Sequence, residues 1–210
     1  DKSSAGLWIF VTSLHVTASR SAPGGYLAMA FRLRCAGFIL GHMQIRIRDA
    51  NRNDLESIWR LNESVVPHVN SVSMGDFEVF LADAAYFRVA VDERDGMQGF
   101  LIALAPTADY DSPNFRWFQQ NHVEFAYIDR IAVFAEFRRL GIAEALYADL
   151  GETAATWARW LACEVNLRPA NPGSLAFHRR VGFTEVGQQE IHGGAKRVAM
   201  LMRAIREPQE

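Results

Sequence analysis

The 210-residue sequence lacks the features that mark several classes of protein. Its only two cysteines, Cys35 and Cys163, lie 128 positions apart and form neither a disulfide framework nor a metal-binding knuckle. No uninterrupted apolar run reaches 18 residues, which argues against a transmembrane helix. The net charge of −2 gives no reason to expect a nucleic acid or an anionic membrane as partner. We therefore expect a cytoplasmic protein that binds neither.

Common catalytic signatures are also missing. The chain has no Gly-x-x-x-x-Gly-Lys-[Ser/Thr] phosphate loop, no Gly-x-Gly-x-x-Gly turn and no Gly-x-Ser-x-Gly elbow. Its six histidines never pair at helical spacing, and no His-Glu-x-x-His occurs. Nucleotide hydrolysis, serine hydrolysis and metalloenzyme chemistry thus lose their usual sequence support, and no metal is expected.

The chain divides by composition into residues 1–43 and residues 44–210. Residues 1–43 hold four basic residues and one acidic residue, which leaves the remainder with a net charge of −5. The apolar stretch at 7–18, followed by small residues, resembles a secretory signal. The alternative, which we prefer, is upstream sequence ahead of a natural start at Met43. We predict one domain over residues 44–210.

Residues 44–210 show a regular alternation of strand and helix patterns. We predict strands at 44–49, 87–91, 99–105, 124–133, 160–165, 184–191 and 197–202. We predict helices at about 55–65 after an Asn51 or Asn53 cap, at 76–85, from about 140 toward 157, and at 172–181. Residues 106–122 are interpreted as a polar and aromatic loop. The order of elements predicts an α/β fold with one mixed sheet covered by helices.

The most informative segment joins a strand to a helix. The strand ends at Ile131-Ala132-Val133, and the helix opens within Arg138-Arg139-Leu140-Gly141-Ile142-Ala143. A helix start exposes unpaired backbone N–H groups and a positive dipole end, which together favour a phosphate or pyrophosphate. An ordinary helix start with two solvated arginines gives the same pattern.

A second segment makes the first more specific. Asn166 ends a strand, Asn171 and Ser174 begin a helix, and Gly182-Phe183 follows its end. The two segments resemble the acyl-CoA signature [Gln/Arg]-x-x-Gly-x-[Gly/Ala] and the Asn-x-x-[Ala/Ser] to Gly-Phe motif of the GCN5-related N-acetyltransferases (GNAT superfamily). The resemblance covers about residues 44–203. Within the superfamily, the chain is similar to an uncharacterised bacterial branch, on residues 61–63, 110–118 and 166–178. It implies a mixed, mostly antiparallel central sheet flanked by helices.

The resemblance also implies where acetyl-CoA binds. The pantetheine arm would bond the strand backbone at Ile131, Ala132 and Val133. The residues expected at the pyrophosphate are Arg138, Arg139, Leu140, Gly141, Ile142 and Ala143. Asn171 and Ser174 would lie beside the pantetheine arm or the acetyl group. Acetyl-CoA is thus the expected co-substrate.

Two residues are the candidate catalytic groups. His178 stands where most relatives have the tyrosine that is thought to protonate the departing thiolate, and an imidazole can donate a proton at neutral pH. Glu164 lies among apolar neighbours on a strand, where burial raises a carboxyl pKa toward that of a useful base. Glu124, Asp129 and Glu63 are the alternatives for the base. Cys163 is interpreted as a core residue.

The acceptor is expected to be a small amine, such as an amino acid, a polyamine or an aminated drug. Candidate acceptor-binding residues are Asn62, Glu63, Tyr110 and Trp117. The aromatic segment 110–118 is either an acceptor-pocket wall or an apolar plug. A protein N-terminus is the second choice of acceptor, and a non-catalytic acyl-CoA sensor is the rival function. A homodimer is compatible with the sequence, which does not decide it.

Overall fold

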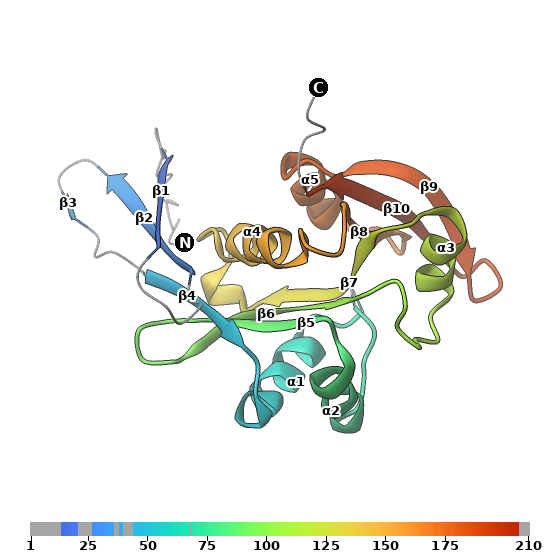
Figure 1. Ribbon diagram of the computed structural model, residues 1–210, viewed down its shortest axis with the longest axis horizontal. Coiled ribbons are helices and arrows are strands. Elements are labelled where there is room, and N and C mark those ends of the chain that lie inside the picture. The colour runs from blue at the N-terminus through green and yellow to red at the C-terminus, as the bar shows by residue number, and fades with distance from the viewer. Residues whose placement is uncertain (1–13, 21–26, 36–37, 40–43, 68, 206–210) are drawn as a thin grey trace, which may run out of the picture.

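The computed structural model describes residues 14–20, 27–35, 38–39, 44–67 and 69–205. In these ranges, ten strands form one sheet in the order β1-β2-β4-β5-β6-β7-β8-β10-β9, with β3 paired to β2 (Figure 1). Each described neighbouring pair is antiparallel except β7 and β8, which run parallel. The predicted mixed, mostly antiparallel α/β fold is confirmed.

Strands β4 to β10 lie close to where the sequence pattern places them, whereas β1, β2 and β3 were not predicted. Their bounds are β1 Leu14–Arg20, β2 Leu27–Cys35, β3 Phe38–Ile39, β4 Gln44–Asp49, β5 Tyr86–Val91, β6 Met97–Leu104, β7 Phe125–Val133, β8 Trp160–Arg168, β9 Thr184–Ile191 and β10 Lys196–Ala204. The helices are α1 Leu55–Ser64, α2 Met74–Asp83, α3 Pro113–Asn121, α4 Ile142–Ala154 and α5 Pro172–Arg180, with short 3₁₀ turns at Arg52–Asp54 and Ala135–Phe137. No helix of the described residues is both long and apolar enough to cross a bilayer.

The sheet separates two hydrophobic cores because successive side chains of a strand point to opposite faces. On β6, Leu101 and Ala103 join the core beneath α4 and α5, whereas Phe100 and Ile102 join the core beneath α1, α2 and α3. Figure 1 shows α4 on one side of the sheet and α1 with α2 on the other. The central strands are buried on both faces, which gives the molecule a rigid platform.

The prediction of a loop over residues 106–122 is wrong, because this segment contains helix α3. Ser112 caps the helix by accepting from the Phe115 backbone N–H, and Pro113 occupies the first turn, where its missing N–H is harmless. Phe115 and Phe118, three positions apart, are fully buried. Aromatic residues lower helix propensity, so only tertiary burial of this face stabilises so short a helix.

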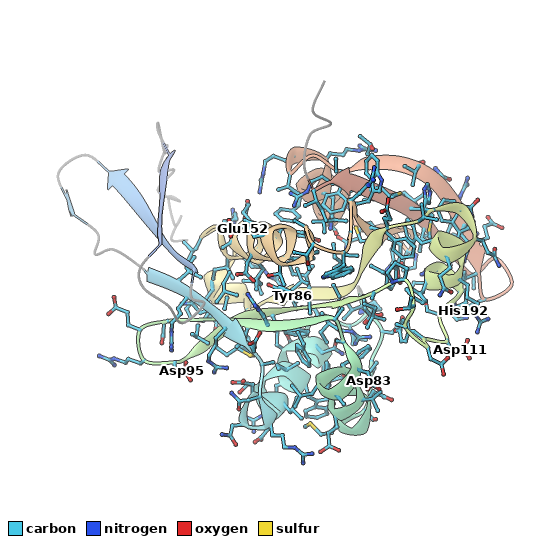
Figure 2. The ribbon with its side chains drawn as sticks, in the orientation of Figure 1. Asp83, Tyr86, Asp95, Asp111, Glu152 and His192 are labelled. Carbon is cyan, nitrogen blue, oxygen red and sulfur yellow. The ribbon has the colours of Figure 1, made fainter. Side chains whose placement is uncertain are left out.

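Helix α4 is fixed to the sheet by a buried polar contact. The Asp149 carboxylate accepts from the Tyr86 hydroxyl at 2.7 Å and pairs with Arg88 at 2.8 Å. Tyr86 lies between the sheet and α4 in Figure 2. This contact holds the helix whose N-terminus faces the cleft described below.

Part of the segment preceding Met43 extends the sheet. Strand β2 pairs with β4 at three positions, and β1 pairs with β2 over its whole length. The predicted boundary at residue 43 and much of the signal-like stretch lie outside the described residues. The division of the chain at that point stays a prediction.

Candidate active site

The parallel strands β7 and β8 separate as they run along the sheet. They pair only at Phe125–Trp160, Ala126–Leu161 and Tyr127–Ala162, although both strands continue well beyond these positions. Each remains paired on its outer side, β7 with β6 and β8 with β10. The opening leaves residues 128–133 without a strand partner on the inner side, so that backbone groups there, apart from the Val133 carbonyl, are available to a ligand.

The N-terminus of α4 lies at the end of this opening. Gly141 caps the helix at φ +82° without a side-chain hydrogen bond, and Arg139 before it also has a positive φ of 63°. The first amides of a helix have no partner within the helix, and the dipole makes this end positive. The loop is therefore suited to an anionic group. Arg138 folds back and donates to the Val133 carbonyl at 3.2 Å.

A cleft of about 1180 Å³ runs from this helix end through the opening between β7 and β8. Most residues predicted for acetyl-CoA line it, namely Ile131, Ala132, Val133, Arg138, Arg139, Gly141, Ile142, Ala143, Asn171 and Ser174. Leu140 does not. The two candidate catalytic residues and Tyr110 line it as well, but Asn62, Glu63 and Trp117 do not. The structure thus places most of the predicted acetyl-CoA residues and both candidate catalytic residues along one groove. Three of the predicted acceptor-binding residues lie outside it.

Glu164 is the carboxylate at the middle of the cleft. Its oxygens accept from the Tyr127 hydroxyl and from the Asn114 amide, each at 2.9 Å. Burial raises the pKa of Glu164 to about 7, although both hydrogen bonds act to lower it, and the negative charge of Asp129 adds to the rise. A carboxyl with this pKa exchanges a proton readily at neutral pH.

Asp129 differs from Glu164 because a cation neutralises it. Its carboxylate pairs with Arg130 at 2.6 Å and accepts from the Tyr110 hydroxyl at 2.5 Å. The same guanidinium donates to the Asn62 side chain at 3.0 Å. Asn62 is fully buried and also donates to Glu63. Asn62 thus contacts the arginine of the buried ion pair, and Glu63 in turn accepts from Asn62.

Trp117 packs against the edge of the sheet. A side chain at Gly187 of β9 would lie only 2.6 Å from its ring, and its own ring meets Phe118 edge-on at a centroid distance of 5.2 Å. Within the aromatic segment, Tyr110 therefore lines the cleft, whereas Trp117 packs against β9 and Phe118.

His178 is buried beside a tyrosine that the sequence analysis did not consider. Its Nδ1 lies 2.8 Å from the Ser174 carbonyl oxygen, which can only accept, so Nδ1 carries a proton and donates. Nε2 of the neutral ring is then an acceptor for the Tyr147 hydroxyl at 2.8 Å. Burial lowers the pKa of His178, which favours this neutral state. The hydroxyl of Tyr147 and the imidazole thus form a coupled pair on the cleft wall.

The acetyltransferase (GNAT) family model matches residues 52–183, which include the divided strands, the α4 N-terminus and Glu164. The chain belongs to the GNAT family. It is accordingly an acetyl-CoA-dependent N-acetyltransferase, which is the predicted enzyme class. No specific branch of the family is identified, and no curated protein matches the sequence.

Solved GNAT structures share the fold at low identity. The ribosomal-protein-S18-alanine N-acetyltransferase of Escherichia coli has a TM-score of 0.59 and 16% identity, covering 79% of this chain and 97% of its own. Chaetomium thermophilum Naa20, bound to a bisubstrate analogue, gives 0.61 and 20%, covering 78% and 93%. The phosphinothricin acetyltransferase of Sinorhizobium meliloti, bound to AcCoA, gives 0.54 and 24%, covering 78% and 92%. At these identities the likeness shows the fold alone.

Among the cleft residues that the sequence analysis assigned no role are Asn114, Tyr127, Tyr147 and Lys196. The Ser112-Pro113 dipeptide was the available signal for α3, and therefore for Asn114. The other three carry no motif of their own. Among the described residues, no group of three or more His, Cys, Asp or Glu side chains is arranged to hold a metal ion.

Proposed function

We propose that this GNAT enzyme acetylates the amine of a small molecule by direct transfer, with Glu164 as the general base. The observation that carries the proposal is the Glu164 carboxyl group, which lines the cleft and has a pKa of about 7. Its hydrogen-bond partners, Tyr127 and Asn114, are neutral. An ammonium group, with an ordinary pKa near ~10, must lose a proton before it attacks. A base of this strength accepts that proton at neutral pH, directly or through a water molecule.

The residues along the groove fit acetyl-CoA. The open backbone of residues 131–133 offers partners to the amides of a pantetheine arm, and the positive-φ loop at Arg139 and Gly141 presents amides to a pyrophosphate. When bound, acetyl-CoA supplies an activated thioester, whose C–S bond is exchanged for the C–N bond of the product amide. Asn171 and Ser174 lie on the α5 side of the same groove and would border the arm.

The departing sulfur needs a proton, and we assign its supply to Tyr147 together with His178. In the neutral pair both imidazole nitrogens are already bonded, so His178 has no N–H to offer the cleft. The Tyr147 hydroxyl, which now donates to Nε2, is the group that can turn toward a thiolate. Nε2 of neutral His178 carries no proton, so the proton on the Tyr147 oxygen is restored from solvent, and His178 orients the hydroxyl as its hydrogen-bond acceptor. His178 is thus proposed as a positioning residue that acts through Tyr147.

A bridge over the groove supports a small acceptor rather than a protein N-terminus. Lys196, at the start of β10, donates to the Asn70 side chain in the α1–α2 loop at 3.1 Å. The Asn70 carbonyl in turn accepts from buried Asn62 at 3.2 Å. Two elements on opposite sides of the cleft are thus joined, which narrows the entrance for an extended peptide. Relatives in fold include enzymes named for phosphinothricin and an enzyme named for an alanine of ribosomal protein S18.

Calorimetric titration of acetyl-CoA tests the groove, and an amine screen tests the reaction. We expect Gly141→Glu to abolish binding, because it places a negative charge where the pyrophosphate would lie. Gly193→Glu, which adds the same charge at another positive-φ glycine in the β9–β10 turn, should bind normally. Release of CoA with small amines, and none with peptides, is the expected result. Binding that survives in Gly141→Glu, or turnover only with peptides, would contradict the proposal.

A further inference from the structure

We call the part of the cleft away from the α4 N-terminus, around Glu164 and Lys196, its acceptor end. Among the described residues, it contains one carboxylate that no cation neutralises. The other carboxylates lining the described cleft are paired: Asp111 with Arg116, Asp129 with Arg130 and Glu144 with Arg180. Glu164 alone has neutral partners, the Tyr127 hydroxyl and the Asn114 amide. An ammonium group entering this end of the cleft therefore finds one negative charge free to receive it.

The same end also contains one lysine without a carboxylate partner in the described part of the chain. Lys196 lines the cleft, and its ammonium donates to the neutral Asn70 side chain. A lysine ammonium has three N–H donors, so this bond leaves capacity for an anionic oxygen. The cleft's arginines are otherwise engaged or lie beside the α4 N-terminus: Arg130 and Arg180 are in ion pairs, and Arg138 bonds a carbonyl.

Glu164 and Lys196 line the same cleft, and the register of the sheet gives the separation of their backbones. Met200 of β10 lies opposite Glu164 of β8, and Lys196 precedes it by four residues. At about 3.3 Å per residue, this places the two backbone positions roughly 13 Å apart along the strand, and both residues line the cleft. Val65, Val69 and Ile191 line the same cleft. His192 and Asp111, which border it, lie on the same side of the molecule in Figure 2.

From this arrangement we propose that the acceptor is a zwitterion, an amine whose own molecule carries a carboxylate or another acidic group, and that Lys196 binds the acidic group. This inference rests on the proposed function and narrows its small-amine acceptor to zwitterions. The ammonium lies toward Glu164 and the acid toward Lys196. A polyamine would place a second positive charge against Lys196, and an amino acid amide would leave Lys196 without its anion.

Initial rates of CoA release test the inference with the full chain. The panel contains the amino acids, their primary amides, spermidine, and the series glycine, β-alanine and 4-aminobutyrate, in which the charges move apart. We expect free acids to exceed their amides by about 10- to 100-fold in kcat/KM, since a charge-assisted hydrogen bond discriminates by that factor. The optimum along the series reports the spacing between the two charges.

The variant Lys196→Met removes the charge but keeps an unbranched side chain. It should remove the preference for acids over amides, through KM more than kcat, while the KM for acetyl-CoA stays unchanged. Arg197→Met is the matched control, because Arg197 is exposed and does not line the cleft. Lys196→Glu should shift the preference toward spermidine.

The outcomes separate this inference from the function on which it rests. If amides or spermidine react as well as free acids, or if Lys196→Met keeps the acid preference, the zwitterion assignment is overturned and the small-amine function stands. If no amine in the panel releases CoA, both are overturned.

Discussion

Replacing Glu164 by glutamine tests the charge of the cleft carboxyl through protein stability, without any knowledge of the acceptor. The pKa of this carboxyl rises from 4.5 to about 7 in the folded chain, chiefly because burial disfavours the ionised form. The folded protein therefore binds a proton more tightly than the unfolded chain does. The contribution of Glu164 to stability is therefore largest below the unfolded pKa and is lost as the pH rises from about 4.5 through 7.

The size of the effect follows from the same two values. Carrying the ionised carboxylate in the fold costs about 3 kcal/mol above pH 7, relative to the neutral acid. Glutamine is neutral at every pH and nearly the same size. Its amide can still accept from Asn114, and the Tyr127 hydroxyl can turn to accept instead of donating. Glu164→Gln is therefore expected to be more stable than the wild type by up to about 3 kcal/mol at pH 8 and equally stable near pH 4.5.

Urea unfolding at pH 8 and pH 4.5 measures this difference, with Glu152→Gln on the exposed face of α4 as a control for loss of one carboxylate. The control should change stability by a few tenths of a kcal/mol at both pH values. A gain in Glu164→Gln that is the same at both pH values would refute the reasoning, since the pH dependence is its whole basis.

The same variant should lose activity while it gains stability. As a general base, Glu164 would make kcat/KM of the wild type rise through a pKa of about 7. Glu164→Gln should lower kcat about 10²- to 10⁴-fold and remove this acid limb. If the acid limb persists in Glu164→Gln, it comes from the titration of another group.

Three further changes probe the surroundings of the site. Asn114→Leu removes a hydrogen bond that lowers the pKa of the buried glutamate, so the acid limb of the pH–rate profile should move to higher pH. His178→Phe leaves the Tyr147 hydroxyl without its acceptor, and kcat should fall about 10-fold or more with the KM for acetyl-CoA unchanged; an equal effect on both would indicate a structural role. Asp149→Ala should destabilise the fold by about 3 kcal/mol in urea unfolding, whereas exposed Asp49→Ala should cost less than about 1 kcal/mol; similar losses would show that burial of the contact does not matter.

The glycine and asparagine motifs were readable from the sequence because their function depends on local backbone. Gly141 adopts a positive φ where the strand–loop–helix pattern predicts a helix start, and Asn171 caps α5 by accepting from the Ser174 amide. A cap or a turn is decided within a few residues, so its signature is contiguous. The same locality explains why the bounds of most strands and helices agree with their hydrophobic periods.

Helix α3 shows where local pattern was insufficient. The aromatic segment 110–118 was interpreted as an acceptor-pocket wall or an apolar plug within a loop, but burial of Phe115 and Phe118 against the sheet makes part of this segment helical. That helix in turn brings Asn114 to Glu164, fifty positions away in the chain. No period in the sequence reports such a contact, because it depends on how the helix packs on the sheet.

The sequence by itself determined the fold class, the family and the loop at the α4 N-terminus, since each depends on short-range pattern or on contiguous motifs. Only the tertiary structure decided which charged groups are neutralised and which are left for a ligand. Asp129 and Glu164 are both strand carboxylates, yet Arg130 pairs with Asp129, whereas the hydrogen-bond partners of Glu164 among the described residues are neutral. The pKa and the chemistry of a carboxyl depend on the groups around it in space, and these come from distant parts of the chain.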